Sequence, residues 1–287
     1  MSNSLMVGYL ESWASPGITF TQAVRNGYDA IVMAFGSIEG SQVSIYRGSF
    51  VPSGSNIKQD ISDAKVAGAK QILCSFGGGN NTYEPGDTSP TDLAESIVLF
   101  LQTYGFTGVD FDLEIDTSAE HLDELCAAIK KKDSSLIITA APQINQDSHD
   151  SNLLLVSTAT AQIYQQALSN KRFDYLFVQG YNNPWPKLNG LGETDVGFIS
   201  ESFKNLKLSV PAETLIAIGE PATKISAGTS IFTVDDVPAD IYQQIADQYA
   251  SIKSDPQFGG AMVWNINQDA DNGDQFVKHV GAVVKGS

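Results

Sequence analysis

The feature that most constrains the fold is a regular alternation of short apolar runs with helical patterns along the whole chain. Eight runs of five to seven residues read as buried strands, at 5–10, 30–35, 71–76, 108–114, 136–141, 174–179, 215–219 and 260–264. A helical pattern follows each run, first near 19 and then at about 56–67, 92–104, 119–131, 153–169, 196–206, 239–253 and 274–284. Strict alternation of this kind predicts a parallel sheet with helices packed outside it.

Eight such units in 287 residues match the α/β architecture of the (β/α)8 TIM barrel, and we expect one catalytic domain over 1–287. The rival is a doubly wound open sheet, which usually carries a glycine-rich phosphate fingerprint after its first strand. Here that position reads Glu11-Ser-Trp-Ala, without the fingerprint. We therefore expect the barrel, with a polar loop at 41–52 and no inserted domain.

Charge and composition narrow the function. The chain has 33 acidic and 17 basic residues, a net charge of −16, which repels nucleic acid and anionic membranes but tolerates a neutral substrate. The two cysteines, Cys74 and Cys126, could form one disulfide bridge, but we expect two buried free thiols. His121, His149 and His279 lack metal-ligand spacing, so we expect no metal and no cofactor.

Two further expectations concern the whole chain. No apolar run approaches the roughly 20 residues of a membrane span. Residues 1–4 lead directly into the first strand without a charged segment, so we expect no signal peptide in this chain. We also expect a monomer.

The run at 108–114 carries the chemistry. Its alternate residues are apolar on one face, and the other face presents Asp110, Asp112 and Glu114, spaced about 7 Å apart along the strand. In a parallel barrel that face is interior, where mutual repulsion and lost hydration raise a carboxyl pKa and suit a general acid. Glu114 lies nearest the mouth and is the candidate acid. Asp112 would orient and balance charge, and Asp110 would support Asp112 from below.

Further polar and aromatic residues collect at the carboxyl ends of the strands, where barrel active sites lie. The candidates for substrate binding are Tyr9, Gly78, Gln143, Gln179, Tyr181, Asn182 and Trp264. Loop aromatics at the same end, Trp13, Tyr83 and Trp185, are candidates for stacking on further parts of a bound substrate.

These motifs resemble those of one enzyme family. Asp110-Phe-Asp-Leu-Glu114, preceded by Thr107-Gly-Val, resembles the D-x-D-x-E signature of glycoside hydrolase family 18, the chitinase family. The segments at 75–78 (SFGG) and 178–183 (VQGYNN) resemble the family's third- and sixth-strand elements, and Trp264 matches its strand-eight tryptophan. The resemblance covers the whole barrel.

The resemblance implies a retaining, substrate-assisted mechanism. Glu114 would protonate the glycosidic oxygen while the substrate's own acetamido oxygen attacks, giving an oxazolinium ion. Asp112 would orient the acetamido N–H, and Tyr181 would hydrogen-bond the acetamido carbonyl. Trp264 would form the floor under the reacting sugar. Glu114 would then act as base toward water.

The resemblance also implies a substrate and a location. Chitin or chito-oligosaccharides would be the substrate, and an extracellular location follows from that polymer. Larger members insert a small α/β domain between strands seven and eight, but about 40 residues separate those strands here. We therefore expect a shallow cleft and endo cleavage.

Two alternatives stay open. An endo-β-N-acetylglucosaminidase acting on N-glycans would carry the same signature, because its substrate also offers an acetamido group. A non-catalytic carbohydrate-binding or inhibitor protein on the same barrel is the other alternative, and such relatives typically lose the acid.

Overall fold

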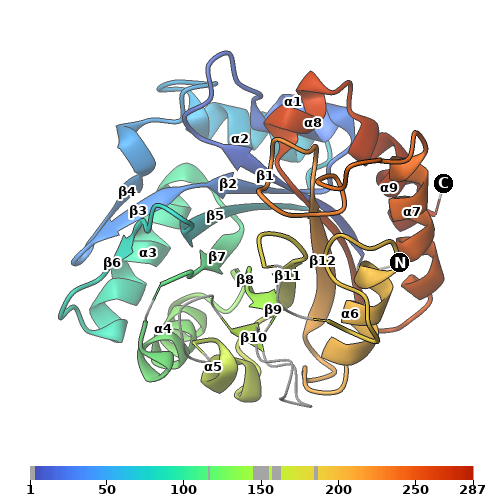
Figure 1. Ribbon diagram of the computed structural model, residues 1–287. Coiled ribbons are helices and arrows are strands. Elements are labelled where there is room, and N and C mark those ends of the chain that lie inside the picture. Colours follow the sequence, from blue (N-terminus) through green and yellow to red (C-terminus); the bar gives the residue numbers. More distant parts are fainter. Residues whose placement is uncertain (1–3, 116, 145–154, 157–162, 184–186, 287) are drawn as a thin grey trace.

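Eight parallel strands close into a barrel in the computed structural model, which describes residues 4–115, 117–144, 155–156, 163–183 and 187–286 (Figure 1). The barrel strands are β1 (Leu5–Glu11), β2 (Ala30–Ala34), β5 (Gln71–Gly77), β7 (Gly108–Asp112), β8 (Ile137–Ala140), β11 (Tyr175–Gln179), β12 (Leu215–Pro221) and β13 (Phe258–Trp264). They neighbour one another in that order, and β13 returns to β1. Pairing of Thr139 and Ala140 with Tyr175 and Leu176 joins β8 to β11 and completes the ring. The predicted (β/α)8 barrel is confirmed.

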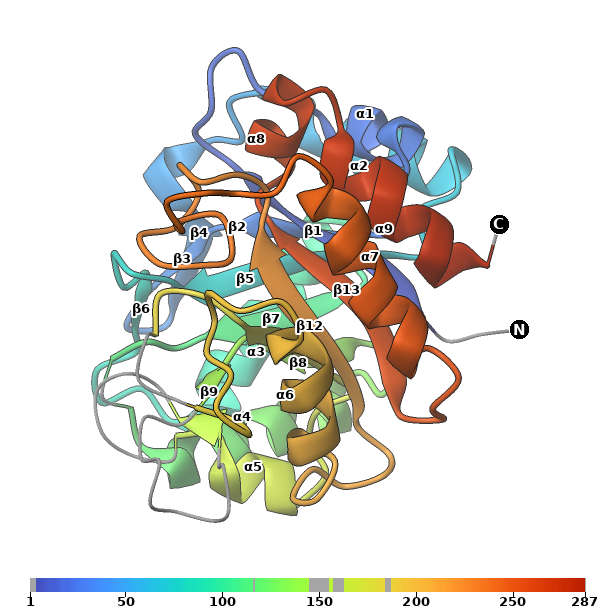
Figure 2. The same cartoon turned by 45° about the vertical axis from the view of Figure 1, so that its right-hand side comes forward.

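Helices surround the barrel, as Figures 1 and 2 show. They are α1 (Phe20–Asn26), α2 (Ile57–Val66), α3 (Pro90–Tyr104), α4 (Ala119–Lys132), α5 (Gln165–Ser169), α6 (Phe198–Leu206), α7 (Ile241–Ile252) and α9 (Gln275–Lys285). A short additional helix, α8 (Ile266–Asp271), follows β13 directly. None of the helices in the described ranges is long and apolar enough to cross a membrane.

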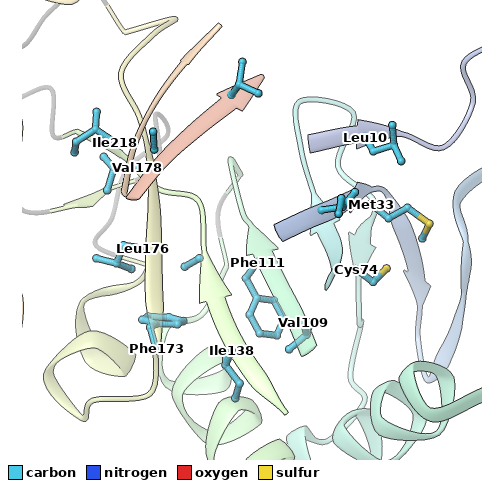
Figure 3. Close-up of a cluster of buried hydrophobic side chains, with 14 of the residues drawn as sticks. Leu10, Met33, Cys74, Val109, Phe111, Ile138, Phe173, Leu176, Val178 and Ile218 are labelled. Carbon is cyan, nitrogen blue, oxygen red and sulfur yellow. The ribbon is translucent and has the colours of Figure 1, made fainter. Parts of the chain in front are cut away.

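The strand residues separate into two layers by alternation. Outward side chains such as Met33, Val109 and Phe111 belong to the large core between the barrel and the helices (Figure 3). Inward side chains such as Val32 and Phe177 form a second, smaller core inside the barrel. This alternation sends the acids of β7 into the barrel while its apolar residues face the helices.

Both cysteines are buried in the outer layer and are free thiols, as the sequence interpretation favoured. Cys74 lies on β5 and Cys126 on α4. Burial raises the pKa of each thiol well above its ordinary value, so neither is a reactive thiolate.

The loop expected at 41–52 is wrong in its first part. Strands β3 (Gly36–Glu39) and β4 (Gln42–Ile45) form an antiparallel hairpin, followed by a 3₁₀ turn at Tyr46–Gly48. A third short strand, β6 (Tyr83–Glu84), pairs with β3. The apolar residues Ile38 and Ile45 are buried, which gives the hairpin a core face that a purely polar reading of this segment overlooked.

The fourth strand also ends earlier than expected, at Asp112 rather than Glu114. Beyond that point the partner strand β5 has ended, because its last pair is Gly77 with Asp112. There the Tyr164 hydroxyl replaces the missing strand partner. It accepts a hydrogen bond from the Leu113 N–H at 2.6 Å and lies 3.1 Å from the Leu113 carbonyl oxygen. A side chain, not a strand, therefore holds the segment that carries Glu114.

Among the described residues, the helix expected at 153–169 is confirmed at 165–169 and is wrong at 155–156. Leu155–Val156 forms a strand, β10, antiparallel to β9 (Gln143–Ile144), and α5 begins only at Gln165. Pairing with β9 overrides the apolar helical pattern at these two positions.

Candidate active site

A pocket of about 390 Å³ opens at the carboxyl ends of the barrel strands. Its lining residues are Trp13, Phe35, Gly78, Gly79, Asn80, Asp112, Glu114, Gln179, Tyr181, Asn182 and Trp264. Most of the predicted site residues are among them, although they come from strand ends far apart in the sequence. Asp110, Tyr9 and Gln143, which were also predicted, lie outside the lining.

Asp110 is fully buried below the pocket and accepts hydrogen bonds from three hydroxyl groups. The Tyr9 hydroxyl donates to Oδ2 at 2.8 Å, the Ser75 hydroxyl to Oδ2 at 2.7 Å, and the Thr139 hydroxyl to Oδ1 at 2.5 Å. The donors come from β1, β5 and β8. Burial raises the Asp110 pKa, but these donors lower it and so favour the ionised carboxylate.

Asp112 and Glu114 meet at one amide group above Asp110. The Gln179 Nε2 lies 2.9 Å from Asp112 Oδ1 and 3.5 Å from Glu114 Oε1. The same nitrogen donates to the Ala141 carbonyl oxygen at 2.9 Å. Asp112 and Glu114 therefore lie side by side on one wall of the pocket.

The environment raises the pKa of both carboxyl groups. Burial raises the Asp112 pKa well above its ordinary value, and the charges of Glu114 and Asp110 raise it further. Burial also raises the Glu114 pKa, while the hydrogen bond from Gln179 lowers both. Glu114 is the more accessible of the two, since Asp112 is 6% exposed and Glu114 is only partly buried. A protonated carboxyl at the pocket surface is what a general acid requires.

Three roughly parallel rings form an aromatic wall of the pocket: Trp264, Phe35 and Trp13. The Phe35 ring lies 6.3 Å from the Trp264 ring and 6.1 Å from the Trp13 ring, each at 25°. The Arg47 guanidinium lies over the Trp13 ring at 5.9 Å. Flat apolar faces of this kind stack well on the apolar faces of sugar rings.

The glycines after β5 allow this wall and the carboxylates to come together. A Cβ on Gly77 would lie 2.0 Å from the Asp112 carbonyl oxygen, and a Cβ on Gly78 would lie 2.4 Å from the Phe35 ring. Both residues have positive φ angles, of 120° and 70°, which glycine adopts without strain. The Gly78 N–H donates to the same Asp112 carbonyl at 2.7 Å.

Two predicted sugar-binding residues have other side-chain contacts, and a third, Gln143, is buried outside the pocket lining. The Tyr9 hydroxyl is engaged with Asp110, and its ring packs against Trp264 at 5.9 Å. Gln143 is buried, on β9. Asn182 lines the pocket, but its Oδ1 accepts the Gly228 N–H at 2.7 Å, which ties β11 to a neighbouring loop.

The loop aromatics divide in the same way. Trp13 lines the pocket as expected, whereas Tyr83 is buried against Phe111 and cannot stack on a bound sugar. Trp185 lies outside the described residues. Phe35, Asn80 and Tyr164 were missed by the sequence analysis, because Phe35 and Tyr164 read as ordinary core residues and Asn80 as part of a loop.

No cluster of three or more metal-ligating side chains occurs in the parts of the chain that the structure describes. The chemistry of the pocket is that of carboxyl, hydroxyl and amide groups beside aromatic rings.

Comparison with known proteins identifies relatives of the chain. The model of the family described as glycosyl hydrolases family 18 matches residues 5–238. An acidic endochitinase of Phaseolus angularis is 31% identical over 205 residues. That match covers 71% of this chain but only 55% of the relative, so this chain spans about half the length of that protein.

Solved structures share the fold over nearly the whole chain. A putative chitinase A from Streptomyces coelicolor has a TM-score of 0.76 at 23% identity, with 99% of both chains covered. A xylanase and α-amylase inhibitor protein, XAIP-I, solved in complex with trehalose, has a TM-score of 0.70 at 16% identity, covering 99% of this chain and 98% of that one. The barrel is thus shared by proteins described as enzymes and as inhibitors.

The raised Asp112 pKa predicts that Asp112→Asn stabilises the protein at neutral pH. A carboxyl whose pKa is higher in the folded chain than its unfolded value of about 3.9 loses folding stability as pH rises through that window. Asn carries no such penalty, so we expect a gain of at least about 1 kcal/mol in unfolding free energy at pH 7. The gain should shrink toward pH 4. Urea unfolding at both pH values measures it.

Asp133→Asn is the matched control for that experiment. Asp133 is only partly buried, and hydrogen bonds from Ser135 lower its pKa, so its ionised form favours the folded state. The control should therefore show no gain at pH 7. A neutral or destabilising effect of Asp112→Asn at pH 7 would contradict the repulsion described for the buried carboxylates.

Proposed function

The chain belongs to glycosyl hydrolase family 18, and from that membership we propose that it is a retaining, endo-acting chitinase organised as a single catalytic domain. Its substrate would be β-1,4-linked N-acetylglucosamine polymers. The observation that carries the proposal is the pair Asp112 and Glu114, which share one amide donor on a single wall of a pocket beside stacked aromatic rings. The similarity to a protein named acidic endochitinase supports chitin as the substrate class.

In the proposed reaction, Glu114 transfers its proton to the glycosidic oxygen as the bond to the anomeric carbon breaks. The oxygen of the substrate's 2-acetamido group forms the new bond to that carbon, which gives an oxazolinium ion. Asp112 orients the acetamido N–H and stabilises the positive charge. Water then attacks the anomeric carbon, the bond from that carbon to the acetamido oxygen breaks, and the water gives a proton to Glu114. The acid is restored, the acetamido group is regenerated, and two inversions give net retention of configuration.

The side-by-side arrangement of the two carboxyl groups supports a nucleophile supplied by the substrate. An enzyme nucleophile must reach the sugar from the face opposite the acid. Asp112 and Glu114 both contact Gln179 Nε2 and therefore lie on the same wall. They are the only carboxyl groups among the described residues that line the pocket.

The remaining pocket residues suit roles at the same sugar. Tyr181 lines the pocket next to the carboxylates, and its hydroxyl group would donate a hydrogen bond to the acetamido carbonyl oxygen. Its pKa is raised by burial and by the charge of Asp112, which keeps the hydroxyl protonated as a donor. Trp264 would form the floor under the reacting sugar, and Phe35 and Trp13 extend the apolar surface away from it.

An open cleft supports endo cleavage. The connection between β12, which ends at Pro221, and β13, which begins at Phe258, contains α7 and leaves no room for an inserted α/β domain. Without such a wall, a long polymer can enter the cleft from the side.

The proposal predicts that Glu114→Gln abolishes hydrolysis and leaves binding nearly unchanged. Glutamine has the size of glutamate but cannot donate the catalytic proton, so turnover of chitin hexamer should fall by a factor of about a hundred or more. Affinity for the hexamer, measured by calorimetry, should stay within about threefold of wild type. Glu124→Gln, an exposed substitution on α4, is the control and should keep full activity. Turnover by Glu114→Gln near the wild-type rate would refute the assignment.

Substrate assistance predicts a strict need for the acetamido group. A chito-oligosaccharide with glucosamine at the reacting position has no carbonyl oxygen to attack, so cleavage there should be slower by about a hundredfold or more. Mass spectrometry of products from partially deacetylated hexamers locates each cut. Equal cleavage after glucosamine and N-acetylglucosamine would exclude this mechanism.

The alternative enzyme activity, that of an endo-β-N-acetylglucosaminidase, is distinguished from chitinase activity by the substrate that is cleaved. Chitin hexamer and a high-mannose glycoprotein, incubated in parallel, should give chitobiose and chitotriose from the first and no released glycan from the second. The reverse pattern would favour the alternative. The inhibitor neighbour supports a non-catalytic alternative, which predicts no product from either substrate. The presence of Asp112, Glu114 and Tyr181 together in the pocket argues against it.

A further inference from the structure

Gln179 stands at the centre of the pocket's hydrogen bonds, and the sequence analysis assigned it only to sugar binding. Its Nε2 faces three oxygen atoms: Asp112 Oδ1, Glu114 Oε1 and the Ala141 carbonyl oxygen. These oxygens come from β7, from the segment after it, and from the residue after β8. Three acceptors around one amide end determine its orientation, because the flipped amide would place oxygen against oxygen.

We infer that Gln179 is a positioning residue whose amide holds Asp112 and Glu114 together and stabilises the charge that develops on Glu114 as it gives up its proton. This inference rests on the proposed function. It reassigns Gln179 from contact with the substrate to contact with the catalytic acid.

The geometry gives each N–H of the amide a distinct task. One N–H is anchored on the Ala141 carbonyl, which belongs to the backbone and cannot turn away. The other points to the carboxyl pair, close to Asp112 at 2.9 Å and farther from Glu114 at 3.5 Å. A contact of 3.5 Å is weak while Glu114 is neutral, and it strengthens when Glu114 becomes an anion.

A donor that acts more strongly on the product of proton transfer than on the reactant lowers the barrier. Because the amide is anchored before the reaction, no rearrangement is needed at that moment. The same hydrogen bond lowers the pKa of Asp112 and of Glu114 in the resting protein and offsets part of the cost of burying both. Removing the amide should therefore raise both pKa values.

Other titratable groups face the pair from neighbouring elements. They are Asp110 below it on β7, Tyr9 on β1, Tyr164 before α5 and Tyr181 after β11, and the charge of Glu220 on β12 acts on Tyr181. The pKa of each tyrosine is raised well above 10, so the tyrosines stay neutral over the pH range in which activity would be measured. Asp110 and Glu220 are present in both wild type and variant, so a difference between the two proteins reports on Gln179.

The test is Gln179→Met, which keeps the length of the side chain and removes its donors. We expect kcat on chitin hexamer to fall about tenfold or more with KM within about threefold, and both limbs of the kcat/KM pH profile to move up by about one pH unit. Gln179→Glu is the second variant: it keeps the shape and adds a third carboxyl group, so the pH shift should be at least as large. If Gln179→Met fails to fold, Gln179→Glu still tests the predicted shift of the pH profile.

Gln257→Met is the matched control, because Gln257 is a buried glutamine whose Nε2 also donates to carbonyl oxygens, those of Pro211 and Thr214, outside the pocket. It should lower stability without moving the pH profile. A rise in KM with unchanged kcat in Gln179→Met would assign the residue to substrate binding and overturn the inference. An unshifted profile in both Gln179 variants would also overturn it.

A readout independent of turnover separates this inference from the proposed function. The Glu114 carboxyl carbon, labelled with ¹³C and followed by NMR, should titrate at higher pH in Gln179→Met than in wild type. If the wild-type protein cleaves no chitin but the titration shifts, the proposed substrate fails and the role of Gln179 stands. If chitin is cleaved and the titration does not move, the inference about Gln179 fails alone.

Discussion

The buried charge of Asp110 is the constraint on which the site depends. A carboxylate enclosed in a barrel is costly unless donors replace the water it loses. Tyr9, Ser75 and Thr139 supply three short hydrogen bonds from three different strands. Ser75 and Thr139 are also the register partners of Asp110 on β5 and β8, so the strand register places their hydroxyl groups beside the carboxylate.

The strand register also decides which side chains reach the pocket. With Asp110 held at the bottom, the next inward residue of the strand, Asp112, falls at the mouth, and Gly77 packs against its carbonyl where no side chain fits. The Tyr164 hydroxyl then holds the backbone beyond the strand end, so that Glu114 reaches the surface of the pocket. The outward residues Val109 and Phe111 contribute to the helix-covered core, so the same strand stabilises the fold and carries the acids.

Alternation alone predicted the barrel, because the strand and helix periods differ and their order along the chain leaves few topologies. It also predicted which face of β7 is interior and therefore the depth order of Asp110, Asp112 and Glu114. It did not predict that Tyr9 serves Asp110, that Phe35 joins the aromatic wall or that Tyr164 replaces a strand neighbour. Those contacts join residues far apart in the sequence, and no local pattern distinguishes them from ordinary core tyrosines and phenylalanines. The hairpin at 36–45 pairs locally, and it was missed because its buried residues Ile38 and Ile45 stand among polar residues. The strand at 155–156 was missed because pairing with 143–144 decided its structure.

The three acids at 110–114 meet different hydrogen-bond donors from the bottom of the pocket to its mouth. Asp110 receives three hydroxyl donors within 2.8 Å, Asp112 receives the Gln179 amide at 2.9 Å, and the same amide lies 3.5 Å from Glu114. Burial raises the pKa of all three carboxyl groups, and that of Asp112 rises well above its ordinary value because the charges of Glu114 and Asp110 add to its burial. The three hydroxyl donors favour the ionised form of Asp110, whereas Glu114 is the most accessible of the three and is the one whose proton a substrate in the pocket could reach. In the proposed mechanism, the acid and the stabilising carboxylate lie on one wall of the pocket, and a nucleophile supplied by the sugar removes the need for a carboxylate on the opposite wall.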